Sequence, residues 1–206
     1  DEDTTIYLAN QGLAAFPATQ IVDRSGINSV VFSGHANSVA QRLGDVRSNS
    51  LLPALALIDG YEAEHWFASV LQPPGGLAPL LGTGTFANHS WVADAGGAAS
   101  NIQALARMDW LVEQDGYFQA VGASNVSRVI FAYAMNVVVV KNSSATIVMS
   151  TNPLDNIYTE DRPAIHIVVP ESSPSNATGV VSCAAALLQI SAQPDSLSPM
   201  TIKAIL

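Results

Sequence analysis

Two patterns of apolar and polar positions alternate along the chain: short apolar runs, and longer segments in which apolar residues keep helical spacing. The short runs predict strands or strand ends at residues 6–9, 27–32, 55–58, 86–91, 118–122, 137–140 and 165–169. Helical spacing predicts helices over 36–43, 61–71 and 102–114, with Ser100 as a cap for the third and Ser175 opening a last long helix. Strands that alternate with helices favour an α/β fold with a mostly parallel sheet flanked by helices.

No internal repeat or composition shift divides the sequence, so we interpret residues 1–206 as a single domain. Hydrophobic residues make up 49% of the chain and charged residues 12%, which suits a large buried core. The Gly- and Pro-rich stretch 72–84 is predicted to be a loop. No apolar run is long enough to cross a bilayer, so we expect no membrane span.

The charge and the cysteine content narrow the classes of partner and cofactor. A formal net charge of −9 makes a nucleic-acid backbone an unfavourable partner. One cysteine, Cys183, excludes an internal disulfide framework and a cysteine-rich metal site, and its apolar helical segment predicts a buried structural thiol. His65, His89 and His166 lack carboxylate or cysteine partners at ligand spacing. We therefore interpret these histidines as structural and expect no zinc site.

Acidic residues near Asn156 are the remaining candidates for binding a cation. Asp155, Glu160 and Asp161 carry carboxylates of the kind that binds calcium. We interpret them as acids of a surface loop, with structural calcium as the alternative. The sequence therefore predicts no cofactor.

A secreted protein is the localisation that the sequence favours. Lysine is scarce, and Ser, Thr and Asn are abundant. No signal peptide is visible, and the start at Asp1 is typical of a mature or trimmed end. The chain has four Asn-X-Ser/Thr sites, the acceptor pattern for N-glycosylation, at Asn88, Asn125, Asn142 and Asn176.

Polar residues at strand ends and helix starts are the candidates for chemistry, because ligands in open parallel sheets bind beyond the carboxyl ends of the strands. They are Asn10, His35, Asn125 and Ser175. Ser175 follows a proline-marked turn, and a hydroxyl at a helix N-terminus suits either a nucleophile or a plain N-cap. A serine, an imidazole base and an amide that stabilises an oxyanion are together the components of acyl transfer.

Six segments, in order, carry motifs of one protein family: 35–40 (His-Ala-Asn-Ser-Val-Ala), 88–91 (Asn-His-Ser-Trp), 121–125 (Val-Gly-Ala-Ser-Asn), 162–170, 175–188 and 198–206. Together they resemble the subtilisin-like serine proteases along nearly the whole chain. The resemblance implies a three-layer α/β fold in which Ser175 is the nucleophile, His35 the base and Asn125 the oxyanion donor. It also implies a polypeptide substrate that pairs as an added strand near Ser90 and Trp91.

The acid of the family's catalytic centre is the main departure. The family's first-strand motif, Val-Ile-Asp-Ser/Thr-Gly-Ile, corresponds here to residues 8–13, which offer Asn10. An asparagine keeps the shape of the carboxylate but neither fixes the imidazole tautomer nor stabilises the imidazolium. Asp23, which lies before Arg24 and a Ser-Gly-Ile segment, is the alternative acid, and we favour Asn10 as the structural counterpart.

Smaller departures also separate the chain from the family. Ser173-Pro174 replaces the Gly-Thr before the nucleophile, and Gly179 replaces the proline inside the nucleophile helix. The chain is shorter than a usual catalytic domain and stops within the last helix segment, as a C-terminal truncation would leave it. Two functions are therefore compatible with the sequence: a divergent serine peptidase, active or impaired, and an inactive pseudoprotease that binds or assembles. An ester hydrolase is less favoured, because the chain has no Gly-X-Ser-X-Gly elbow.

Overall fold

The computed structural model describes residues 21–24, 34–43, 58–73, 77–80, 86–91, 97–123, 130–143, 165–192 and 197–206. Within these ranges the elements follow one another as β1 (Ile21–Asp23), α1 (Gly34–Leu43), β2 (Ile58–Gly60), α2 (Ala63–Trp66), the π-helical turn η3 (Phe67–Leu71), β3 (Phe86–His89), α3 (Ala98–Asp115), β4 (Phe118–Gly122), the 3-10 turn η4 (Ile130–Tyr133), β5 (Val138–Asn142), β6 (Ile167–Val169), α4 (Pro174–Ser191) and α5 (Pro199–Ile205).

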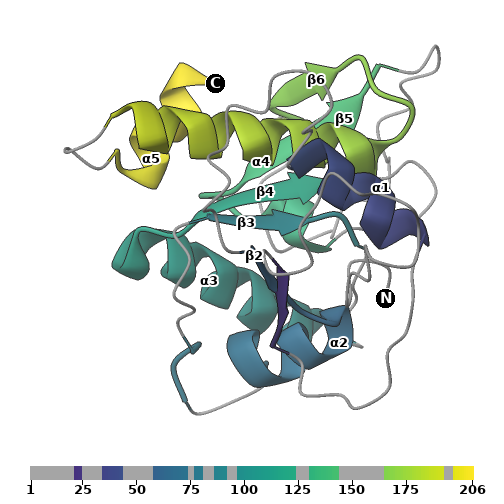
Figure 1. Ribbon diagram of the computed structural model, residues 1–206. Helices are drawn as coiled ribbons and strands as arrows, with labels where there is room; N and C mark the ends of the chain where they lie inside the picture. Colours follow the sequence, from purple (N-terminus) through teal and green to yellow (C-terminus); the bar gives the residue numbers. More distant parts are fainter. Residues whose placement is uncertain are drawn as a thin grey trace.

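All strand pairing in the described part of the chain is parallel, which confirms the predicted α/β class. Four strands form one sheet in the order β3-β4-β5-β6, and β1 pairs with β2 in a separate two-stranded sheet. Helices cover both faces of the larger sheet: α4, with α1 and α5, lies on one face and α3 on the other (Figure 1). The carboxyl ends of β3 and β4 lie side by side, since His89 pairs with Val121.

The two central strands form where the sequence predicts them. β4 has the predicted bounds, and β5 starts one residue later than predicted. All residues of both strands are buried. Burial on both faces explains why neither strand alternates between apolar and polar residues, although Gln119 of β4 and Lys141 of β5 are polar and buried.

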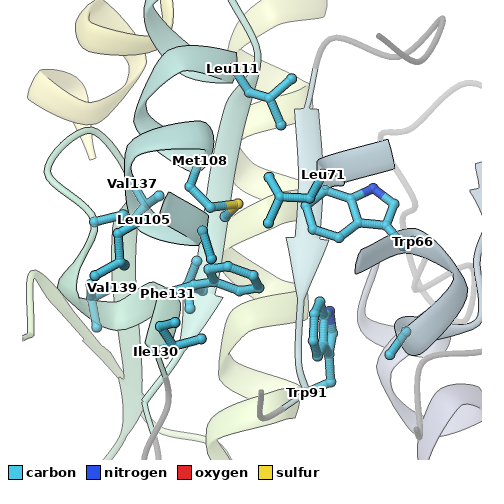
Figure 2. Close-up of a cluster of buried hydrophobic side chains, with 14 residues drawn as sticks. Trp66, Leu71, Trp91, Leu105, Met108, Leu111, Ile130, Phe131, Val137 and Val139 are labelled. Carbon is cyan, nitrogen blue, oxygen red and sulfur yellow. The ribbon is translucent and has the colours of Figure 1, made fainter. Parts of the chain in front are cut away.

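One hydrophobic core lies between the sheet and α3 (Figure 2). On α3, Leu105, Met108 and Leu111 recur every three residues and so share one face of the helix. The rings of Trp91 and Phe131 meet edge to face with their centroids 5.3 Å apart, a geometry that aromatic pairs favour. This core anchors the chain just beyond the end of β3.

A second core lies between the opposite face of the sheet and α4. Ala177, Val181 and Ala185 are four residues apart on α4 and pack towards β4 and β5. The contact is closest at the end of β4, where a Cβ added to Gly122 would lie 2.9 Å from Oγ1 of Thr178. The N-terminal turns of α4 are therefore pressed against the carboxyl end of β4.

Helix α1 crosses α4 at Gly179. A Cβ placed on Gly179 would lie 2.8 Å from Cβ of Arg42 and 3.1 Å from the carbonyl oxygen of Val39. Neither atom belongs to the flexible end of a side chain, so neither can move aside without displacing a helix. The missing side chain is what allows the two helices to approach this closely.

Replacing Gly179 by alanine is expected to lower the free energy of unfolding by about 1–2 kcal/mol. Overpacking costs about 1–3 kcal/mol, towards the upper end against backbone, while the better helix propensity of alanine returns about 1 kcal/mol. Urea unfolding measures the difference. A Gly179→Ala protein at least as stable as the wild type would contradict the close crossing.

Several predicted boundaries need correction. Helix α1 begins at Gly34, two residues before the predicted start. Gly97 is the N-cap of α3, so the prediction that Ser100 caps this helix is wrong. The good helix formers Ala98 and Ala99 extend the helix past that serine.

Other elements were shifted, missed or fall outside the described residues. The helix predicted over 61–71 is present, but it changes from an α-helical to a π-helical turn after Trp66. The strand predicted over 55–58 is described from Ile58 to Gly60, and β6 starts at Ile167 rather than 165. Strand β1 was not predicted. The predicted strands at 6–9 and 27–32 lie outside the described residues.

Candidate functional site

Ser175 lies in the first turn of α4 and is not its N-cap. Ser173 is the N-cap: its backbone is extended, and its Oγ accepts a hydrogen bond from the Asn176 N–H at 3.1 Å. Pro174 is the first helical residue, a position that suits the fixed φ of proline. The interpretation of Ser175 as a plain capping serine is therefore wrong, and its hydroxyl is not engaged in capping.

The hydroxyl of Ser175 instead forms one half of a reciprocal pair with Ser90. Ser175 Oγ donates to the Ser90 carbonyl oxygen at 3.2 Å, and Ser90 Oγ donates to the Ser175 carbonyl oxygen at 3.1 Å. Asn88 Nδ2 donates to Ser90 Oγ at 2.8 Å, and Ser182 Oγ donates to Asn88 Oδ1 at 3.1 Å. This chain of hydrogen bonds joins the first turn of α4 to the end of β3.

His35 is the second residue of α1, as Ser175 is the second residue of α4. Its side chain is half-buried, and its Nδ1 atom is fully buried. Burial lowers the pKa of the His35 imidazole below its ordinary value. The ring is therefore neutral at pH 7, which is the state that a general base requires.

Helix α1 packs on α4 (Figure 1). His35 and Ser175 each lie four residues, or about 6 Å along the helix axis, before the residues that meet at the crossing, Val39 and Gly179. Ser38 Oγ also donates to Asn176 Oδ1 at 3.0 Å, and Asn176 directly follows Ser175. The N-terminal turns of both helices are thus directly linked.

Ser90 and Trp91 follow the last residue of β3, an edge strand of the four-stranded sheet as far as the structure describes it. Both side chains are buried. The Trp91 ring lies in the core shown in Figure 2, and its Nε1 donates to Nδ1 of His89 at 3.2 Å. A ligand at this edge would therefore meet the main chain of these residues rather than the Trp91 ring.

His89 is a structural residue, as the sequence predicted. Trp91 donates to Nδ1, so Nε2 carries the proton and donates to Gln119 Oε1 at 2.8 Å. Burial lowers the pKa of His89 to about 4, and the hydrogen bond to Gln119 offsets this shift only in part. The ring stays neutral at physiological pH and serves packing and hydrogen bonding.

The candidates for the acid and for the oxyanion donor are only partly described. Asn10 and Asn125 lie outside the described residues. Asp23 is the last residue of β1 and is in register with Gly60 of β2, so it belongs to the two-stranded sheet. The next residue, Arg24, forms an ion pair with Asp59 across that sheet, with Nε and Oδ1 2.8 Å apart.

Two of the four glycosylation sites are buried in the fold. Asn142 is 6% exposed and Asn176 is 5% exposed. Asn142 Nδ2, the atom that a glycan would occupy, donates to the Glu171 carbonyl oxygen at 3.2 Å. Asn176 Nδ2 likewise donates to Ser172 Oγ at 3.0 Å. These two sites therefore lend no support to a glycosylated native protein.

The described residues contain no group of three or more His, Cys, Asp or Glu side chains that could hold a metal ion. Asp155, Glu160 and Asp161 lie outside them. Cys183 is half-buried in α4 rather than fully buried as predicted. Among the described helices, none is long and apolar enough to cross a membrane.

Four polar residues of the site were not singled out from the sequence: Ser38, Ser173, Asn176 and Ser182. Pro174 was the available signal for one of them, because proline at the first helical position identifies the preceding serine as the N-cap. No such signal connects Ser38 with Asn176, which are 138 residues apart.

The arrangement offers the groups that nucleophilic catalysis needs. A serine hydroxyl lies in the first turn of one helix, where the helix dipole favours an anion, and a neutral imidazole lies in the first turn of the adjacent helix. Strand β3, which lies at the edge of the sheet formed by the described strands, ends next to the serine. Comparison with known proteins finds no family model and no curated protein that matches the chain.

Proposed function

We propose that this protein is a divergent, secreted subtilisin-like serine peptidase in which Ser175 is the nucleophile and His35 the general base. The observation that carries the proposal is that both residues occupy the first turns of two helices that cross at Gly179. The Ser38–Asn176 hydrogen bond adds support, because it ties those same turns together. The parallel sheet with helices on both faces is compatible with the three-layer fold of that family.

The proposed reaction begins with attack of Ser175 Oγ on the carbonyl carbon of a peptide bond. His35 takes the hydroxyl proton on Nε2 and then gives it to the leaving amine, which breaks the C–N bond. Water, activated by the same imidazole, releases the acyl group and restores the serine. The Ser175 N–H and the Asn125 amide would stabilise the oxyanion, because Pro174 has no N–H and the Asn176 N–H is bonded to Ser173 Oγ.

The proposed substrate is an extended polypeptide that adds a strand beside β3 near Ser90. Main-chain hydrogen bonds supply affinity in this mode of binding. The Ser90 carbonyl oxygen, which accepts the Ser175 hydroxyl at 3.2 Å, lies at the point where such a strand would pass the nucleophile. The buried Trp91 ring would support this edge from the core side.

Asn10 would occupy the place of the acid, with Asp23 as the alternative. The position of Asp23 at the end of β1, in the smaller sheet, favours Asn10, because Ser175 and Ser90 belong to the larger sheet and its helix. With asparagine in this place the imidazolium would lack a counter-charge. The enzyme would then be slow, although its nucleophile and base are in place.

A pseudoprotease that binds or assembles is the second candidate. The observation in its favour is that the Ser175 hydroxyl donates to a main-chain carbonyl oxygen. A proton held in this way is not available to a base until the contact breaks. Under this reading the strand edge of β3 would bind a polypeptide without cleaving it.

A fluorophosphonate probe distinguishes the two candidates. It reacts with an activated serine, forming an Oγ–P bond and releasing fluoride, and mass spectrometry locates the adduct. We expect an adduct on Ser175 that is absent in Ser175→Ala. Ser69→Ala is the control and should be labelled normally, because Ser69 Oγ donates to the His65 carbonyl oxygen within its own helical segment. Absence of an adduct at every pH would leave the pseudoprotease.

A further inference from the structure

We propose that a hydrogen-bonded bridge from Ser38 through Asn176 to Ser172 holds His35 at its working distance from Ser175. Asn176 is the central positioning residue of this bridge. The inference rests on the proposed function, since it assigns these residues a role in that same site. None of the three residues touches the reacting atoms in this mechanism.

Asn176 is built into the junction between the two helices. Its Oδ1 accepts from Ser38 Oγ at 3.0 Å, and its Nδ2 donates to Ser172 Oγ at 3.0 Å. Asn176 is 5% exposed, so its amide is buried between partners that are themselves more accessible to solvent. Both ends of the amide are thus used, one towards α1 and the other towards the turn before α4.

The bridge connects the segments that carry the reacting residues. Ser38 lies three residues after His35, on the same face of α1. Asn176 follows Ser175 directly, and its N–H donates to the N-cap Ser173. A shift of α1 relative to α4 would therefore break the bridge and separate the imidazole from the hydroxyl.

The crossing point leaves the register between the helices to other contacts, because Gly179 has no side chain to insert into α1. A single buried polar contact can fix the register between helices. The other polar link, between Arg42 Nε and Glu171 Oε1 at 3.1 Å, is part-exposed, and such pairs contribute little.

Positioning of this kind has a large effect on rate. Proton transfer requires the oxygen and nitrogen to approach within hydrogen-bond reach. A misplacement of about 1 Å can cost about 10²-fold in rate. Loss of the bridge should therefore slow the reaction by about 10- to 100-fold without removing any reacting group.

The test measures the second-order rate constant for fluorophosphonate labelling of Ser175 across pH. Ser38→Ala and Asn176→Leu are each expected to lower the rate constant on the high-pH plateau by about 10- to 100-fold. The double variant should be no slower than the slower single variant, because one bridge is lost in every case. Ser38→Thr, which keeps the hydroxyl, should recover most of the rate.

Arg42→Gln is the matched control, because it removes the other polar link between α1 and the segment before α4. We expect its labelling rate to stay within about 3-fold of the wild type, as for a weak exposed pair. Ser38→Ala removes only one hydroxyl, so it keeps the test informative if Asn176→Leu fails to fold.

The outcomes separate the inference from the function on which it rests. If the wild type is labelled at Ser175 and Ser38→Ala reacts at the same rate, the bridge is overturned and the peptidase stands. If the effects of the two single variants multiply in the double variant, the residues act separately and the bridge is again overturned. If the wild type is not labelled at any pH, the peptidase is overturned and the inference with it.

Discussion

His35→Ala is expected to lower the rate constant for fluorophosphonate labelling of Ser175 by about 10²–10⁴-fold, the usual contribution of a general base. The serine proton has no other described acceptor than the Ser90 carbonyl oxygen, which cannot carry it away. Labelling of the wild type should increase with pH as the imidazole loses its proton. Because burial lowers the pKa of His35, the midpoint should lie below pH 6.5.

The pH profile is the decisive part of this measurement. The base works only when neutral, so the rate should fall as the pH drops through the lowered pKa of His35. In His35→Ala the labelling rate should no longer fall over this pH range. His65→Ala is the matched control, because His65 lies in α2, away from α1 and α4, and its replacement should preserve the rate and the profile. If His35→Ala kept the wild-type profile, another group would be the base.

Asn10→Asp is expected to have the second large effect, in the opposite direction. In trypsin-like enzymes, replacement of the corresponding carboxylate by an amide costs about 10⁴-fold in kcat. Restoring the carboxylate should recover part of the lost rate, so we expect the rates of labelling and of peptide hydrolysis to rise by about 10²-fold or more. The added negative charge should also raise the pKa of His35 and move the midpoint of the pH profile upwards.

Asp23→Asn decides between the two candidates for the acid. If Asn10 occupies the acid position, this change should have little effect on the rate constant. If Asp23 already supplies the carboxylate, Asp23→Asn should slow labelling strongly and Asn10→Asp should have little effect. The pair of variants, compared in the same assay, therefore assigns the third member of the centre.

The sequence predicts best those elements whose formation depends on burial alone. Strand β4 is buried on both faces, and its predicted and observed bounds agree. Helix α3 ends close to its predicted C-terminus. It begins earlier than predicted, because alanines are good helix formers and extend it at the N-terminus. Strand β1 has only three residues, too few for a periodic pattern, and was missed.

The site is harder to predict, because it is assembled from contacts between distant segments. The motifs place Ser175 and His35 near helix starts, and the structure puts both in the first turns of two helices that pack against each other. Pro174 identifies Ser173 as the N-cap of α4, and this local signal was present in the sequence. The Ser90–Ser175 pair spans 85 residues and depends on how β3 and α4 pack. A single sequence carries no record of such a contact.

The burial of Asn142 and Asn176 also bears on how the protein can be made. Both are sequons, and oligosaccharide transfer acts on chains that have not yet folded. A glycan on Asn176 would stand between α1 and α4, and one on Asn142 would stand between β5 and the segment that leads into α4. In a host that glycosylates nascent chains, folding therefore competes with a modification that the native packing excludes. A bacterial host without this pathway removes that competition. The choice of expression host should therefore affect how much of the protein reaches its native fold.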